Sequence, residues 1–155
     1  MKGFTLVELL LYVSIVAVVI LFAAAFLSLL MQSRLKNQTI AEVEQQGVQV
    51  MQTITQTIRN ADTINSPAQG ETAASLSIDS TIFDLSSGVI RITQGGTPIS
   101  LTNFQVTASS LSFYNLSRTD TPGTIRIQFT LAFVNPSGRN EYDYSKTFYQ
   151  TATLR

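Results

Sequence analysis

An unbroken run of 23 uncharged residues, from Leu9 to Met31, is the feature that most limits how this chain can fold. Its only polar interruptions are Tyr12, Ser14 and Ser28. With a rise of about 1.5 Å per residue, a helix of this length crosses a hydrocarbon layer of about 30 Å. The 155-residue chain has room for one modest domain plus an extension, and such a domain cannot easily bury a helix that is apolar on every side. We therefore predict a membrane-spanning helix over residues 4–31.

One acidic residue, Glu8, lies at the beginning of this apolar run. A carboxylate in a membrane costs roughly a few kcal/mol at depth and less near the interface, so it normally has a partner. No Lys or Arg follows one helical turn later, which indicates that the partner is not in the same helix. Glu8 is therefore a candidate functional residue. The alternative is that it only marks the interfacial end of a membrane anchor.

The helical pattern continues past Met31 without a proline as far as residue 61. Apolar or small residues recur three or four positions apart and draw one stripe along this helix: Ile40, Val43, Gly47, Met51, Ile54, Ile58 and Ala61. The other faces are polar, so residues 32–61 are predicted to form an amphipathic helix that packs on the rest of the chain. Gly47 indicates a close approach by another element. Pro67 is expected to mark the exit from the helix.

Residues 62–155 are rich in Ser, Thr, Asn and Gly and contain short segments in which apolar and polar residues alternate. The clearest alternation, over 124–133, predicts a strand with one buried face. A turn-rich connection joins it to a segment in which Tyr142, Tyr144 and Phe148 share a face, as in a hairpin. Weaker predictions are strands at 76–85, 89–93 and 111–116 and turns at 95–98 and 120–123, with much of 70–120 as loop or edge strand.

These patterns together predict an α+β fold. A long N-terminal α-helix, with a membrane half and an amphipathic half, would pack on a small antiparallel β-sheet head formed by residues 62–155. The apolar face of the sheet would cover the helical stripe between Ile40 and Ala61. Neither element can hide its apolar side alone, so one interface solves both burial problems.

Composition argues against catalysis, metal chemistry and nucleic-acid binding. The chain has no His and no Cys, and its ten Lys and Arg balance ten Asp and Glu without forming a basic run. We predict no enzyme activity, no cofactor, no metal site and no nucleic-acid partner. Glu141 and Asp143, expected on one strand face, could contact a cation, but a solvated face is the stronger expectation. Tyr142 and Tyr144 are expected in the core, and an exposed Tyr149 could be adhesive.

The segment GFTLVELLLYVSIVAVVI, residues 3–20, resembles the class III signal sequence of type IV pilins and pseudopilins. The resemblance implies that residues 1–3 are a leader peptide, and that a prepilin peptidase cuts after Gly3 and methylates the new N-terminus at Phe4. Glu8 would then be the fifth mature residue. It also implies a partner for Glu8, namely the positively charged N-terminus of a neighbouring subunit. Two charges removed from water together cost much less than one alone.

The resemblance further implies a structural subunit of a type IV pilus-like filament. Its partners would be prepilin peptidase, the inner membrane before assembly, and other pilin subunits in a homo- or hetero-polymer. The chain would first be a single-pass protein of the cytoplasmic membrane and later part of an extracellular pilus at the cell surface. The short leader, the absence of cysteine, and Ala25 where many major pilins have a helix-kinking proline favour a minor pilin or a pseudopilin. Residues 56–62 (QTIRNAD) and 148–155 (FYQTATLR) resemble PilW-like minor subunits.

Other interpretations stay open at this point. The chain could be a pseudopilin of a type II secretion or DNA-uptake (competence) machine. From a different class, it could be a membrane-anchored binding protein that does not polymerise, or a secreted β-domain released by cleavage after 23–25 (Ala-Ala-Ala). Arg34 and Lys36, beyond the apolar run, favour the opposite orientation for the head by the positive-inside rule. We give the N-terminal motif more weight than that rule.

Overall fold

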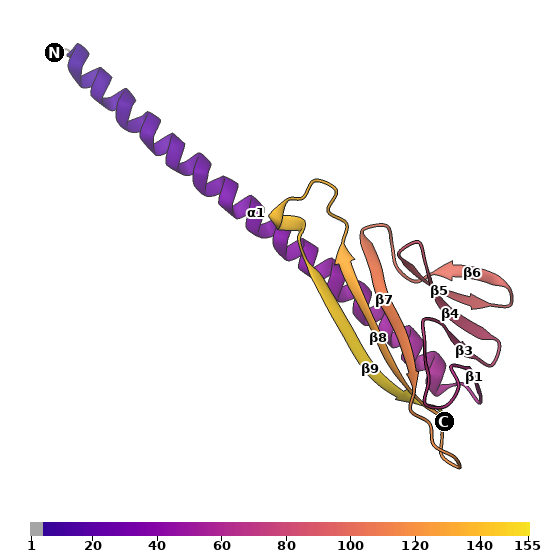
Figure 1. The fold of residues 1–155 in the computed structure, drawn as a ribbon. Helices are drawn as coiled ribbons and strands as arrows, with labels where there is room; N and C mark the ends of the chain where they lie inside the picture. The colour runs from indigo at the N-terminus through magenta and orange to yellow at the C-terminus, as the bar shows by residue number, and fades with distance from the viewer. Residues whose placement is uncertain (1–4) are drawn as a thin grey trace.

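One helix, α1 (Leu6–Arg59), precedes a β-rich head in the computed structural model, which describes residues 5–155. Its 54 residues correspond to about 80 Å of helix. Thr5 caps the N-terminus: its backbone is extended and its hydroxyl accepts a hydrogen bond from the backbone N–H of Glu8 at 3.3 Å. Figure 1 shows the first half of α1 projecting away from the head and the second half lying along it.

The helix ends at Arg59, two residues before the predicted end at residue 61. Asp79, from a distant turn, fixes the bend that follows. Its carboxylate accepts hydrogen bonds from the backbone N–H groups of Asp62 (3.1 Å) and Thr63 (2.9 Å) and from the Thr63 hydroxyl (2.9 Å). This contact spans 16 or 17 positions of the chain, so no local pattern in the sequence predicts it.

The head contains two antiparallel sheets where the sequence pattern predicted one. The first has the strand order β1-β3-β4-β5-β6 and the second the order β2-β7-β8-β9. Their bounds are β1 Ile64–Ser66, β2 Thr72–Ala73, β3 Leu76–Ile78, β4 Thr81–Ser86, β5 Val89–Gln94, β6 Thr97–Ser100, β7 Val106–Asn115, β8 Thr124–Phe133 and β9 Ser145–Thr153. A short 3₁₀ helix, η1 (Asn140–Tyr142), lies between β8 and β9. In Figure 1 the second sheet lies along α1 and β6 lies furthest from the helix.

Strand β8 has the bounds that the period-two pattern predicted, and it pairs with β9 as expected. The segment 76–85 instead forms two strands, because Asp79 adopts a positive φ of 45° in a tight turn between them. Strand β7 begins at Val106, five residues before the predicted start at 111. A bulge between Ser109 and Ser112 interrupts its alternation, and this hides the first part of the strand from a period-two pattern.

The core lies between the buried stripe of α1 and the apolar faces of both sheets. Its largest fully buried side chains are Phe83, Phe113, Phe129, Ile54, Ile58, Leu76, Ile78, Ile90, Ile125, Ile127, Leu131 and Val43. Phe148 of β9 stacks on Phe129 with ring centroids 5.4 Å apart, and the same ring covers Gly47, where a Cβ would collide with it. Gly47 therefore permits the close approach that the sequence indicated. The α+β architecture predicted from the sequence is confirmed.

Candidate functional site: the uncovered half of the helix

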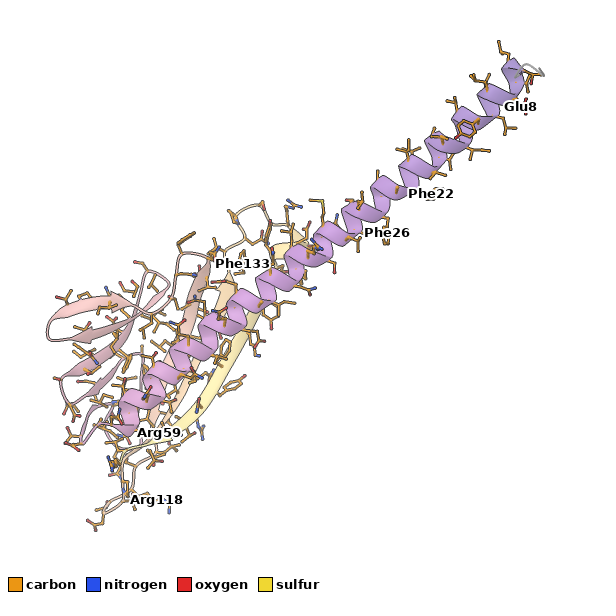
Figure 2. All side chains as sticks on the ribbon, turned by 180° about the vertical axis from the view of Figure 1, so that it is seen from behind. Glu8, Phe22, Phe26, Arg59, Arg118 and Phe133 are labelled. Atoms are coloured by element: carbon orange, nitrogen blue, oxygen red, sulfur yellow. The ribbon has the colours of Figure 1, made fainter. Side chains whose placement is uncertain are left out.

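The first half of α1 carries a continuous apolar surface that nothing in the described chain covers. Every residue from Thr5 to Arg34 is exposed, including large side chains such as Leu10 (64% exposed) and Phe22 (73%). The helix is long and apolar enough to cross a membrane, and no part of its most apolar window is buried against the head. Figure 2 shows Phe22 and Phe26 on this bare part, with Glu8 near its far end. A surface of this kind needs lipid or other protein around it.

Glu8 lies in the first turn of α1, where the helix dipole favours a negative charge. Within the described residues, the nearest basic residue along the helix is Arg34, which is 26 positions away (34 − 8), or about 39 Å of helix. No cation of the described helix or head can therefore reach the carboxylate. Its neighbours in the chain, Val7 and Leu9, are apolar and exposed.

The two residues predicted at the processing site, Gly3 and Phe4, lie outside the described residues. Their predicted roles, and that of Glu8 in assembly, stay predictions. By chain position alone, an amine on Phe4 would precede Glu8 by four residues, or about 6 Å of helix.

Polar contacts from the second half of α1 hold the head close to the point where the uncovered half ends. The Lys36 ammonium donates to the backbone oxygens of Asn140 (3.1 Å) and Asp143 (2.6 Å). Glu42 accepts from the side-chain amide of Asn103 at 2.7 Å. The connection between β8 and β9 is thus fixed to the helix beside Lys36, about five residues after the apolar run.

Glu44 is the centre of a second cluster between α1 and β9. Its carboxylate accepts from the Lys146 ammonium at 2.5 Å and from the Tyr144 hydroxyl at 3.0 Å. The hydrogen bond from Lys146, followed by that from Tyr144, lowers the pKa of Glu44 below its usual value. Desolvation, followed by the hydrogen bond to Glu44, raises the pKa of the Tyr144 phenol. No local pattern in the sequence predicts these contacts, because Tyr144 and Lys146 lie 100 and 102 positions after Glu44.

The other residues singled out in the sequence have structural roles in the head. Glu141 lies in η1 and Asp143 follows it, so the prediction of one shared strand face was wrong. The Glu141 carboxylate pairs with Arg139 at 2.7 Å. Tyr142 stacks on Phe133 with centroids 5.7 Å apart, and Tyr144 contacts Glu44. Within residues 5–155 no three acidic side chains gather in a cluster that could hold a metal ion.

Comparison with known proteins identifies the N-terminus but not the head. Residues 1–24 match the prokaryotic N-terminal methylation motif. No curated protein and no solved structure matches the chain. The chain therefore carries a type IV pilin class III signal sequence, which confirms the prediction made from residues 3–20. A motif of this kind implies processing by a prepilin peptidase and assembly with other pilin subunits. The finer resemblance to PilW-like subunits stays a prediction.

Proposed function

We propose that the chain is a structural subunit of a type IV pilus-like filament, with no catalytic role. One observation carries the proposal: a helix begins with an exposed apolar half that bears one acid, Glu8, in its first turn. The methylation motif at residues 1–24 covers the first part of this half. A folded head at the other end of the helix leaves the apolar half free to contact its surroundings.

The proposed life of the subunit has two stages, which differ in what surrounds the apolar half of α1. Before assembly, lipid covers it, and the chain is a single-pass protein of the cytoplasmic membrane with its head outside. After cleavage following Gly3, the same surface moves into a bundle of neighbouring helices in an extracellular filament. Dispersion contacts between close-packed apolar side chains then replace contacts with lipid tails.

Glu8 makes this exchange selective for processed subunits. An isolated carboxylate among apolar helices is costly, and a cation that is desolvated beside it offsets much of that cost. The new amine of Phe4 on a neighbouring copy is a suitable cation, since methylation leaves its positive charge in place. An uncleaved chain carries no amine at Phe4, so it offers its neighbour no such partner and enters the filament poorly.

The first test is the intact mass of the mature chain recovered from cells. Loss of Met1, Lys2 and Gly3 together with the gain of one methyl group on Phe4 supports the proposal. Cleavage after Ala25 would instead identify a secreted β-domain, and a retained Met1 would identify a plain membrane anchor. Recovery of the processed chain in sheared surface filaments separates a pilus subunit from a pseudopilin that remains in the cell envelope.

The second test replaces Glu8 and measures entry into filaments. When Glu8→Ala and the parent are produced together, we expect the variant's share of the filament to fall at least about tenfold. Without Glu8, the buried amine of Phe4 on the neighbouring copy has no partner, and an unpartnered buried charge costs about 3–5 kcal/mol. Ser14→Ala is the matched control in the same apolar segment, since the Ser14 hydroxyl already donates to the Leu11 carbonyl of its own helix at 2.8 Å. Equal entry of Glu8→Ala and the parent would contradict the pairing of Glu8.

A further inference from the structure

The connection between β8 and β9, residues 134–144, meets α1 at the end of the head that faces the uncovered half (Figure 1). We propose that this connection contacts the membrane before assembly: it lies among the lipid headgroups, and Arg34 and Arg139 bind their phosphate groups. The inference rests on the proposed function, because it needs the membrane stage of the subunit. It goes beyond that function by giving the head a contact with lipid.

Distance along the helix places the connection at the level of the headgroups. Lys36 follows Met31, the last residue of the apolar run, by five positions (36 − 31), or about 8 Å of helix. Its ammonium donates to the backbone oxygens of Asn140 (3.1 Å) and Asp143 (2.6 Å), which fixes the connection at this level. The headgroup layer is about 5–8 Å thick on each side of the hydrocarbon core. If the apolar run fills that core, the connection lies in or directly against the headgroup layer.

The charged side chains at this level favour contact with phosphate. Residues 32–36 and 134–144 contain three basic residues, Arg34, Lys36 and Arg139, and two acidic ones, Glu141 and Asp143, for a net charge of 3 − 2 = +1. Such a surface is attracted to a membrane that contains anionic lipid.

Both arginines keep N–H donors that a phosphate can use. The Arg139 side chain is 53% exposed, and its ion pair with Glu141 at 2.7 Å uses one nitrogen, which leaves other donors of the guanidinium free. Arg34 is exposed and takes part in none of the ion pairs of residues 5–155. A guanidinium binds phosphate through two parallel hydrogen bonds.

Lipid is the occupant that the fold itself supplies. The spanning helix holds the connection beside the bilayer, so the local concentration of headgroups is high without any recruited partner. Val134, which is 39% exposed, and the exposed Pro136 add apolar contact at this boundary. The contact also gives a use to Arg34 and Lys36, which oppose an external head by the positive-inside rule: one binds phosphate and the other holds the connection.

Single-tryptophan variants test this contact, since the natural chain contains no tryptophan. Asn140→Trp reports from the connection. Thr119→Trp, in the exposed loop between β7 and β8, is the control at the opposite end of the head, where Figure 2 shows the neighbouring Arg118. The full chains are placed in lipid nanodiscs that carry a spin label on the headgroup. We expect the label to quench Asn140→Trp fluorescence at least about twofold more than Thr119→Trp fluorescence. Equal quenching of the two would overturn the inference.

A third variant separates this outcome from that of the proposed function. Phe22→Trp lies in the apolar half and should be quenched by spin labels deep in the acyl chains. Quenching at position 22 without quenching at position 140 would refute the headgroup contact and leave the membrane stage intact. Absence of quenching at both positions would refute the membrane stage as well.

Charge substitutions test the role of phosphate binding. In the Asn140→Trp chain, Arg34→Gln with Arg139→Gln should lower headgroup quenching by about half in nanodiscs with anionic lipid. Arg118→Gln with Arg155→Gln removes the same charge from exposed positions outside the connection and should change nothing. Arg34→Gln alone breaks no ion pair of residues 5–155 and should give part of the loss even if the double variant destabilises the head. Equal quenching in all these variants would refute phosphate binding by the two arginines.

Discussion

The two halves of α1 share one continuous helix but differ in what covers them. Residues from Thr5 to Arg34 are exposed on every side, and the run from Leu9 to Met31 within them is uncharged and mostly apolar. Beyond them, the buried positions Val43, Val50, Ile54 and Ile58 form one stripe under the β-sheets. The two halves differ in how their apolar side chains are arranged around the helix axis. An apolar surface on one side calls for a head, whereas an apolar surface all around calls for lipid or for other helices.

Because of this difference, we expect the two halves of α1 to contribute to different properties of the chain. The covered half determines whether the head folds, because its stripe forms one wall of the core. The uncovered half contributes nothing to that core, and its apolar surface faces the surroundings of the chain. Substitutions in the two halves should therefore affect different measurements.

The largest expected effect comes from truncating isoleucine in each half. Ile54 is fully buried and Ile20 is 61% exposed. We expect Ile54→Ala to lower the free energy of unfolding of the head by about 2–5 kcal/mol, since it leaves a cavity in the core. Ile20→Ala should leave that free energy nearly unchanged. Denaturant unfolding of the full chain in detergent, followed by the tyrosine signal of the head, measures both. A similar loss for the two variants would contradict the division between the halves.

A smaller effect is expected at the closest contact between helix and sheet. Gly47→Ala places a methyl group against the ring of Phe148. Overpacking of this kind costs about 1–3 kcal/mol, and the better helix propensity of alanine returns about 1 kcal/mol. We therefore expect Gly47→Ala to lower the free energy of unfolding of the head. The control variant Gln45→Ala, on the exposed face of the helix, should leave this free energy unchanged.

A double variant sharpens this prediction. Phe148→Leu removes the ring that blocks the added methyl group, so the loss caused by Gly47→Ala should be smaller in that background than in the parent. Strictly additive losses in the same denaturant experiment would show that the ring over Gly47 is not the cause.

The smallest expected effect is a pH dependence at the end of the covered half. The backbone N–H groups of Asp62 and Thr63, followed by the Thr63 hydroxyl, lower the pKa of the Asp79 carboxyl. A carboxyl whose pKa is lower in the folded state stabilises the fold above its unfolded pKa of about 4. That stabilisation is lost as the pH falls from about 4 through the lower pKa of the folded state.

The matched variant for this pH effect is Asp79→Asn. Its unfolding midpoint should be lower than that of the parent at neutral pH, and the gap should narrow as the pH falls through the window below about 4. A gap that does not change with pH would assign the effect of Asp79 to geometry alone. The uncovered half should have no part in this pH effect, since the Asp79 carboxylate contacts the segment after the helix.

How far the sequence predicts the fold depends on how local its signals are. The long helix follows from an uncharged run and a period-3.6 stripe that continue one another without a proline, and β8 follows from an uninterrupted period-two pattern. The early start of β7 was missed because the bulge near Ser110, which has a φ of 54°, shifts the alternation by one residue. The division into two sheets was also missed. Strands such as β2 are only two residues long, which is too short for any periodicity.

The candidate site divides in the same way. Glu8 could be identified from the sequence, because a carboxylate at the start of an apolar run has a high desolvation cost and therefore suggests a function. The contacts of Glu44 and Asp79 could not, since their partners come from distant strands and turns. No cation of the described residues lies within reach of Glu8, so the fold of one chain supplies no partner for its carboxylate.

The most direct measurement of the central claim is the distance between Glu8 and the N-terminus of a neighbour inside the filament. Filaments grown from a mixture of subunits, some with ¹³C-labelled glutamate and the others with ¹⁵N-labelled phenylalanine, report only contacts between copies in solid-state NMR. The Phe4 amine is resolved from backbone amides by its chemical shift. We predict dipolar coupling between this amine and the Glu8 carboxyl carbon, as in an ion pair. Well-ordered mixed filaments without that coupling would contradict the account.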